Sequence, residues 1–486
     1  MSLRISGRIT FIALMAGAAA CGVACSSEFE NCDANRSCPG DDKGDSGSGG
    51  DAGEGNDPSG GSSGKGGTSQ GGNDGGGDAG TGAGGDAGEG DAGQGNAGEG
   101  GEGGEGGSGE DANAVHGIVK STMGFPLANW KVVLDGVETL TDEDGKFTVS
   151  GAGAEYDLLI APTDHHLRLY QGLTTREPVV VMTLKSDDPG YVAKSATVSG
   201  TVSNALVGST GIEVWQNNLG PSTYAPDFIT ALLPNVASDV NFTQPVSWSS
   251  PDDPLPIELF VANTDGATWR TGSATLNVTD GADFTNLGIP VADRPTRIVT
   301  VSVDSDDALT PSALFSCVSS ICSYKLDSIF PAEAPLPTGL PASQRVAVRV
   351  LGQTEAGLYG ACAVVPDDQD AIGLSLQAPP VVHGPESGAP VDEDTVFSWD
   401  PYPEGVHFLK VTGSTAFLLE VITAETSFSV SMIEGVELIP ALQHSWFMTG
   451  IGPSSSVDDH VAPLPFLEQV GGSMHAALTS TRTFTP

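Results

Sequence analysis

The sequence has little positive charge. Among its 486 residues only 20 are Lys or Arg, whereas 62 are Asp or Glu, and the net charge is −42. A surface this acidic repels phosphate backbones, so we do not expect nucleic acid as a partner. The simplest role of the charge is to keep an exported protein soluble.

Motifs for catalysis are also missing. The sequence contains no GxSxG elbow, no HExxH pair and no Cys/His spacing typical of a zinc site. The polar runs Asp164–His166 and Asp458–His460 are interpreted as solvated turns, and Asp142–Gly145 as a hairpin turn, not a calcium loop. We therefore expect no enzyme, no cofactor and no metal.

No apolar run is long enough to form a stable membrane span. Ile9–Ala20 follows Arg4 and Arg8, and its length is typical of a signal peptide over residues 1–20. The small residues before Cys21 resemble a bacterial lipobox, which implies a diacylglycerol on that thiol. Cys25 is the alternative, and an ordinary secretory signal is a second alternative. The resemblance implies an exported lipoprotein anchored in a membrane, in the outer membrane or at the cell surface of a Gram-negative bacterium.

Large apolar side chains are absent from residues 40–111, which consist mainly of Gly, Asp, Glu, Ser and Ala. Such a segment cannot bury a core, so we predict a disordered acidic linker over 40–112, behind a Cys-containing segment over 21–39. As a flexible coil this linker would hold the remaining chain tens of ångströms from its anchor.

The seven cysteines do not identify the lipidated residue. Lipid on Cys21 leaves three cysteines in the N-terminal part, among them Cys32 and Cys38, which are close enough to close a small loop. The other three are Cys317, Cys322 and Cys362. An oxidising compartment favours disulfides among these residues, but the spacing leaves their pairing open.

From Asn113 onward short apolar runs alternate with turn residues, which indicates an all-β chain of tandem β-sandwich domains. Residues 113–190 form the first predicted domain, with a hairpin over Thr139–Val149 whose tip is Asp144-Gly145. This domain resembles the carboxypeptidase regulatory-like family, a transthyretin-like sandwich that is not catalytic. The residues that carry the resemblance are Val115–Val119, Gly124–Ala128, Trp130–Leu134, Thr141–Phe147 and Tyr156–Ile160.

The middle of the chain is less clearly divided. Residues 193–303 begin with Val198–Val202 and are predicted to form a second sandwich that ends with a strand over Arg297–Val303. Residues 304–377 are predicted to form a small Cys-containing β unit or an extension of the second sandwich.

The last region, 378–486, resembles the fibronectin type III family. The resemblance rests on Pro379-Pro380, on Val396–Trp399 as a strand with a core tryptophan, and on His444–Phe447 as the aromatic strand, where His444 replaces the usual tyrosine. An immunoglobulin-like sandwich of another topology is the alternative.

Three tryptophans have polar neighbours and are candidates for stacking on a ligand, namely Trp215, Trp248 and Trp269. Together these features predict a lipid-anchored surface protein that displays non-catalytic binding or adhesion modules, with polysaccharide or a surface protein as partner. The alternative is a secreted hydrolase, or an accessory subunit of one, whose site lies within 193–377.

Overall fold

The structure is a computed structural model. It describes residues 113–122, 124–207, 212–218, 228–233, 237–249, 253–305, 309–318, 321–325, 329–341, 344–413, 417–433, 438, 443–461 and 473–486. The chain divides into two compact units, one of residues 1–34 and 110–486 and one of residues 35–109. The signal peptide, the linker and Cys21, Cys25, Cys32 and Cys38 lie outside the described residues.

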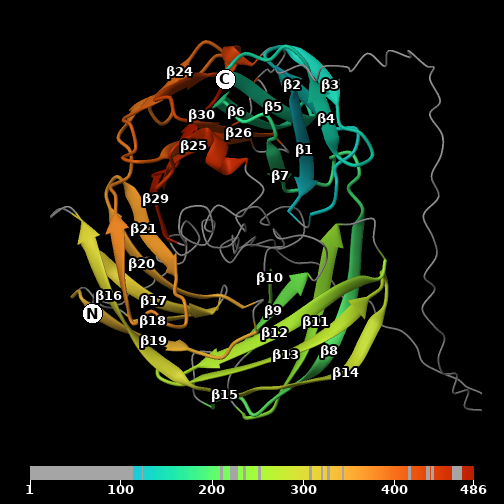
Figure 1. Ribbon diagram of the computed structural model, residues 1–486, viewed down its shortest axis with the longest axis vertical. Helices are drawn as coiled ribbons and strands as arrows, with labels where there is room; N and C mark the ends of the chain where they lie inside the picture. Colours follow the sequence, from blue (N-terminus) through green and yellow to red (C-terminus); the bar gives the residue numbers. More distant parts are fainter. Residues whose placement is uncertain are drawn as a thin grey trace, which may run out of the picture. The chain divides into compact units, whose positions relative to one another are not determined.

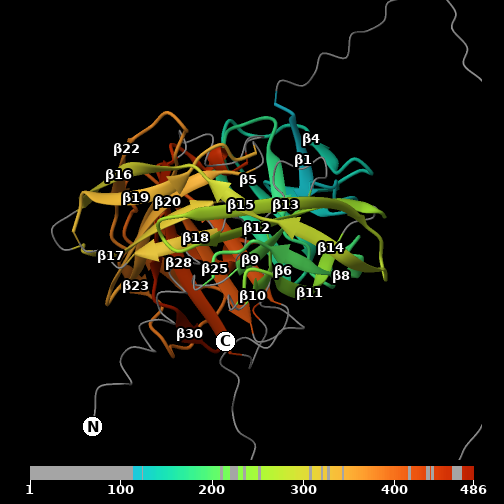
Figure 2. The ribbon, with the colours of Figure 1, turned by 90° about the horizontal axis from the view of Figure 1, so that it is seen from below.

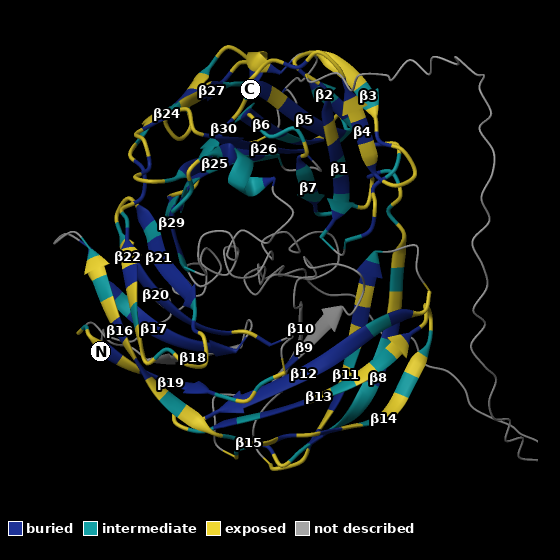
Figure 3. Ribbon diagram, viewed as in Figure 1, coloured by how far each residue is buried: buried dark blue, intermediate teal, exposed yellow. Residues whose placement is uncertain are grey.

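The described part of the chain is built from β-strands, and η1 and η2 are its helical turns. This confirms the all-β class and its tandem sandwiches (Figure 1). Alternation of apolar and polar residues explains most strands, because successive side chains of a strand point to opposite faces. Figure 3 shows the resulting bands of buried and exposed residues along β8 (Ala193–Ser203) and β14 (Asp283–Pro290).

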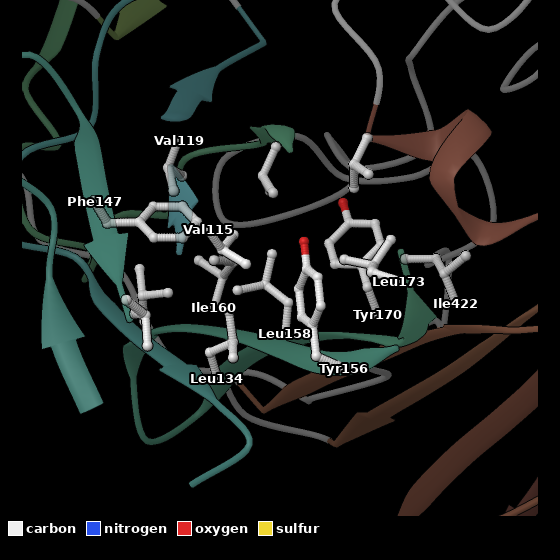
Figure 4. Close-up of a cluster of buried hydrophobic side chains, with 14 of the residues drawn as sticks. Val115, Val119, Leu134, Phe147, Tyr156, Leu158, Ile160, Tyr170, Leu173 and Ile422 are labelled. Atoms are coloured by element: carbon white, nitrogen blue, oxygen red, sulfur yellow. The ribbon is translucent and has the colours of Figure 1, made fainter. Parts of the chain in front are cut away.

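The first sandwich packs β4-β1-β7 against β3-β2-β5-β6. Its strands are β1 (Val115–Ser121), β2 (Lys131–Leu134), β3 (Val137–Leu140), β4 (Lys146–Val149), β5 (Tyr156–Thr163), β6 (His166–Leu173) and β7 (Val179–Met182). Trp130, Leu158 and Ile160 are fully buried between the two sheets. Figure 4 shows this core, with Phe147 pointing toward Val115 and Val119.

The predicted hairpin over Thr139–Val149 is wrong. Strand β3 pairs with β2, whereas β4 pairs with β1, so the connection crosses from one sheet to the other. Asp142 forms the turn, because its Oδ1 accepts hydrogen bonds from the backbone N–H groups of Asp144 at 2.9 Å and Lys146 at 2.8 Å. Gly145 alone has positive φ in this turn, at 73°, whereas a type I′ turn requires two such residues. Oδ1 of Asp142 is thus used by the turn.

The second sandwich comprises a five-stranded and a three-stranded sheet, in the orders β10-β9-β12-β13-β15 and β11-β8-β14. Figure 2 shows β14 beside β8, its parallel partner. The remaining strands are β9 (Ile212–Asn218), β10 (Phe228–Leu233), β11 (Val240–Ser249), β12 (Leu255–Thr264), β13 (Trp269–Val278) and β15 (Ala292–Arg294).

The third group of strands corrects the division of the middle region. Strand β16 (Thr296–Ser305), expected at the end of the second sandwich, pairs with β19 (Ala332–Pro337) and β22 (Ala371–Leu376). This sheet packs on a second layer in which β17 (Pro311–Val318), β18 (Ile321–Lys325), β20 (Val346–Thr354) and β21 (Gly357–Val364) are neighbours. Residues 296–376 therefore share a sandwich core, to which Tyr402 and Ala477 of the last region also contribute.

The last region also has two layers. The sheet β23-β24-β27 is formed by β23 (Val382–Gly384), β24 (Val396–Trp399) and β27 (Ser427–Ser429). The facing layer holds β25 (Val406–Gly413), β26 (Leu418–Thr423), β28 (His444–Gly452), β29 (Ser473–Thr479) and β30 (Arg482–Phe484), with η1 (Val430–Met432) and η2 (Val457–His460) in the connections. Trp399 and Trp446 are buried in its core, as expected.

One sheet runs through the first, third and last regions. Its order is β18-β17-β20-β21-β29-β28-β25-β26-β6-β5-β2-β3, and β30 pairs with β28. Strand β29 joins β21, and β26 lies parallel to β6 with Leu418 opposite His166. Figure 1 shows β26 beside β6 although the two strands are far apart in the sequence. The sandwiches are therefore fused at their strand edges.

Candidate functional site

The junction of β6 and β26 contains a buried carboxylate with two cationic neighbours. Glu420 of β26 is 1% exposed, and its Oε2 accepts a hydrogen bond from Nε of Arg168 on β6 at 2.7 Å and a second from Nη2 of Arg168. Its Oε1 lies 3.4 Å from Nζ of Lys410 on β25. Two cations thus share one buried carboxylate, which satisfies the charges that parallel pairing brings into the interior.

Apolar side chains of the last region complete the core of the first. Val406, Ile422, Val457 and Val461 belong to the same buried cluster as Trp130. Figure 4 shows Ile422 next to Tyr170 and Leu173 of the first sandwich. The junction is therefore a packed interior, and the two regions form one body at this edge.

A buried histidine lies close to this junction. The Nδ1 atom of His166 is 2.9 Å from both carboxylate oxygens of Asp188, and the two side chains are 1% and 0% exposed. The expectation of a solvated turn over Asp164–His166 is thus wrong for His166, because its ring points inward while Asp164 and His165 are exposed. The feature that the sequence analysis missed is that β6 begins at His166 and is buried on both of its faces.

The run Asp458–His460 is also more structured than expected. Ser456 caps η2, and Oδ2 of Asp459 accepts hydrogen bonds from Oγ of Ser454 at 3.1 Å and from the N–H of Ser455 at 2.7 Å. Asp458 accepts the N–H of Thr174 at 2.8 Å, which attaches η2 to the loop after β6. The run is therefore a connection between regions and not a solvated turn.

Ser454, Asp459 and His460 are the three residue types of a catalytic triad. Oγ of Ser454 lies 3.3 Å from Nε2 of His460, but Oδ2 of Asp459 accepts its hydrogen bonds from Ser454, Ser455 and Ser456. A triad needs the carboxylate on the other ring nitrogen. Desolvation lowers the pKa of His460 to about 4, against an opposing effect of Asp459. A base with so low a pKa removes protons poorly at neutral pH, so this cluster fits a cap on η2.

The candidate stacking tryptophans are placed differently from the expectation. Trp248 is 5% exposed and Trp269 is 0% exposed, and Trp269 donates its indole N–H to the Pro335 carbonyl at 3.2 Å. Their polar neighbours misled the prediction, because in a strand those neighbours point to the opposite face. These two indole faces are not available to a ligand. Trp215 lies on β9, and its side chain is outside the described residues.

The middle of the chain lacks histidine. The eight histidines are all outside 193–377, at positions 116, 165, 166, 383, 407, 444, 460 and 475. A hydrolase site that combines histidines with carboxylates from residues 193–377 alone is therefore excluded. Within the described ranges no group of three or more His, Cys, Asp or Glu side chains is arranged to hold a metal ion.

Two of the late cysteines are disulfide-bonded. These are Cys317 on β17 and Cys362 on β21, both completely buried. Cys322 of β18 stands opposite Cys317 in the strand register.

No helix within the described residues is long and apolar enough to cross a membrane.

Comparison with known proteins identifies no family. No family model matches the chain, and no curated protein matches it. Among solved structures, a leucine-rich repeat protein from Bacteroides thetaiotaomicron is 11% identical with a TM-score of 0.17, covering 38% of this chain and 26% of that one. The chain thus spans about a quarter of that protein.

Two further structures are bacterial surface proteins. A streptococcal ancillary pilin is 9% identical with a TM-score of 0.13, covering 54% of this chain and 98% of that one. A pilus adhesin from Lactobacillus rhamnosus GG is 8% identical with a TM-score of 0.11, covering 54% of this chain and 42% of that one. At these TM-scores the likeness carries no argument about function.

Proposed function

We propose that the chain is an exported, lipid-anchored protein that displays a rigid body of fused β-sandwiches for binding at the cell surface, without catalysis. The observation that carries the proposal is the β6–β26 junction, where a shared core and the Arg168–Glu420 pair join the ends of the sandwich region. Fusion of this kind suits a protein that presents a fixed surface to a partner.

The anchor in this proposal is a lipid on Cys21. Its support is the sequence of the first residues, with Arg4 and Arg8 ahead of an apolar run that ends in Ala20. Two or more acyl chains on one cysteine anchor a protein stably. The resemblances of 113–190 to a regulatory-like sandwich and of 378–486 to a fibronectin type III domain support the role of non-catalytic modules.

The anchor is tested by labelling growing cells with an alkyne fatty acid and separating membranes from soluble proteins. We expect the wild-type chain to be labelled and membrane-bound, and Cys21→Ser to lose both properties. Cys25→Ser is the matched control and should keep them. Label retained by Cys21→Ser but lost from Cys25→Ser would move the anchor to Cys25, and label on neither wild type nor variants would refute a lipoprotein.

Binding is tested with the full mature chain, solubilised in detergent and applied to glycan arrays and to isolated envelope material. Saturable binding that competes with unlabelled protein supports recognition of a surface component. Turnover of generic ester, glycoside or peptide substrates by the pure protein, lost on unfolding, would overturn the non-catalytic assignment.

A further inference from the structure

Both disulfide-bonded cysteines lie in one sheet, but they are too far apart to bond to each other. Cys317 is opposite Ala347 of β20, and Ala347 is opposite Val364 of β21, two residues from Cys362. Two strand spacings and a two-residue offset separate the Cα atoms by about 12 Å. A disulfide requires roughly 4.4–6.8 Å, so each thiol has a different partner.

Cys322 cannot be the partner of Cys362. It lies on β18, one strand further from β21 than Cys317, and its Cα partner in the register is Cys317. Directly opposite residues of antiparallel strands have Cα atoms about 4.5–5.5 Å apart, which suits a cross-strand disulfide. The cysteines left for Cys362 are then those of the N-terminal part, at positions 21, 25, 32 and 38.

The face that carries Cys362 is covered. Strand β20 is buried without interruption over Val346–Gly352, so both of its faces are shielded from water (Figure 3). One face packs in the sandwich core, with Val348 and Val350. On the other face the described apolar cluster consists of Ala313, Phe315, Cys317, Ala347 and Leu351, all from β17 and β20 themselves. The cover therefore comes from residues beyond this cluster.

We infer that the N-terminal segment 21–34 covers this face and is joined to it by a disulfide between Cys362 and Cys25 or Cys32. Cys25 and Cys32 lie on either side of Phe29 in the sequence, whereas Cys38 is followed by Pro39 and the glycine-rich linker. Cys21 is reserved for the lipid in the proposed function, but the inference does not depend on that function, because Cys32 is free of lipid under either lipidation choice.

The chemistry of the two surfaces matches. Arg349 stands opposite Cys362 in the register and is 6% exposed, and its side chain emerges on the same face. The segment supplies Glu28, Glu30 and Asp33 around Cys32, together with Phe29 as an apolar group. A guanidinium at an interface attracts carboxylates, and an aromatic side chain suits an apolar sheet face.

The link also completes the pairing of cysteines. With lipid on Cys21, three cysteines remain at each end of the chain, so full pairing within each end is impossible. One bond between the ends leaves one pair at each end, Cys317 with Cys322 and Cys38 with the remaining early cysteine. The acidic linker then becomes a closed loop instead of the free tether expected from the sequence, and the sandwiches lie beside the anchor.

The test is a disulfide map of the full mature protein, purified from an oxidising compartment with free thiols alkylated before unfolding. Trypsin separates the late cysteines into two peptides. Cys362 is the one cysteine of peptide 350–410, whereas Cys317 and Cys322 share peptide 298–325. Cys38 falls in 37–43, whereas Cys25 and Cys32 are in the N-terminal peptide that ends at Arg36. We expect peptide 350–410 linked to that N-terminal peptide.

A Cys362 peptide that is alkylated, linked to 298–325, or linked to 37–43 without the N-terminal peptide would overturn the inference. A second measurement uses native protein cut at Lys43 or Lys65 in the linker. The N-terminal fragment should stay with the sandwiches until a thiol is added, and Cys362→Ser should release it without reduction. Cys38→Ser is the matched control and should retain it, and release from the wild type without reductant would also overturn the link.

Discussion

At the scale of single residues, Thr141 shows how one side chain directs the path of the backbone. It is 2% exposed, donates its hydroxyl to the Leu127 carbonyl at 2.5 Å and accepts the N–H of Trp130 at 2.9 Å. These bonds hold the start of the crossover between β3 and β4, where a hairpin was expected. The sequence shows a threonine before Asp142 but not the two distant backbone groups that it serves.

Thr141→Val should test this role. The variant keeps the shape but leaves a buried N–H and a buried carbonyl without their partner, which should reduce the free energy of unfolding by about 1–3 kcal/mol. Urea denaturation measures the change. The control is Thr148→Val on the exposed face of β4, where we expect a change within about 0.5 kcal/mol. Equal effects of both substitutions would contradict the role of Thr141.

His475 should make the fold sensitive to acid. It is 5% exposed, and its Nδ1 lies 2.9 Å from the Tyr402 hydroxyl. Burial lowers the pKa of His475 to about 4. Below pH 6.5 the unfolded chain binds a proton that the folded chain binds only near pH 4. Stability should therefore fall as the pH drops through this window, by about 1.4 kcal/mol per pH unit for one such group.

His475→Gln should remove this part of the pH dependence, because Gln does not titrate but can still accept the Tyr402 hydroxyl. The measurement is the free energy of unfolding between pH 7.5 and 4.5. His383→Gln, which removes a half-exposed histidine on β23, is the control and should keep the wild-type dependence. An unchanged slope in His475→Gln would show that folding does not lower the pKa of His475.

At the scale of elements, the pairing of β6 with β26 should depend on Glu420. Glu420→Gln leaves Arg168 and Lys410 at a junction that has lost its negative charge, and breaking such a buried pair typically costs about 3–5 kcal/mol. Hydrogen exchange should show faster amide exchange in β6 and β26. Glu138→Gln breaks the exposed pair with Lys131 and should cost at most about 1 kcal/mol.

The same elements show what the sequence could predict. Strands such as Thr296–Ser305 and Val396–Trp399 were located because β-branched and aromatic residues alternate with polar ones or form short apolar runs. The edge partners were not predictable, because pairing of β6 with β26 leaves no local pattern in either strand. The wrong exposure of Trp248 had another origin, since its serine neighbours were taken to describe the environment of the indole.

At the scale of the whole molecule, the continuous sheet should determine how the sandwiches unfold. The first, third and last regions share strand pairs at β6–β26 and β21–β29, whereas the strands of the second pair only with one another in the described ranges. Calorimetry should therefore show a transition common to the three joined regions. Glu420→Gln should lower its midpoint and leave the transition of the second sandwich in place. A uniform shift of every transition would contradict this.

The parallel pairing of β6 with β26 joins strands that are synthesised at different times. Arg168 and Glu420 are 252 residues apart, so β6 leaves the ribosome long before β26. During that interval the outer edge of β6 carries unpaired backbone N–H and C=O groups, which can pair with the same strand of another copy. Strand β26 therefore protects the edge of β6 once it has been made, and chains that stall before residue 418 should aggregate.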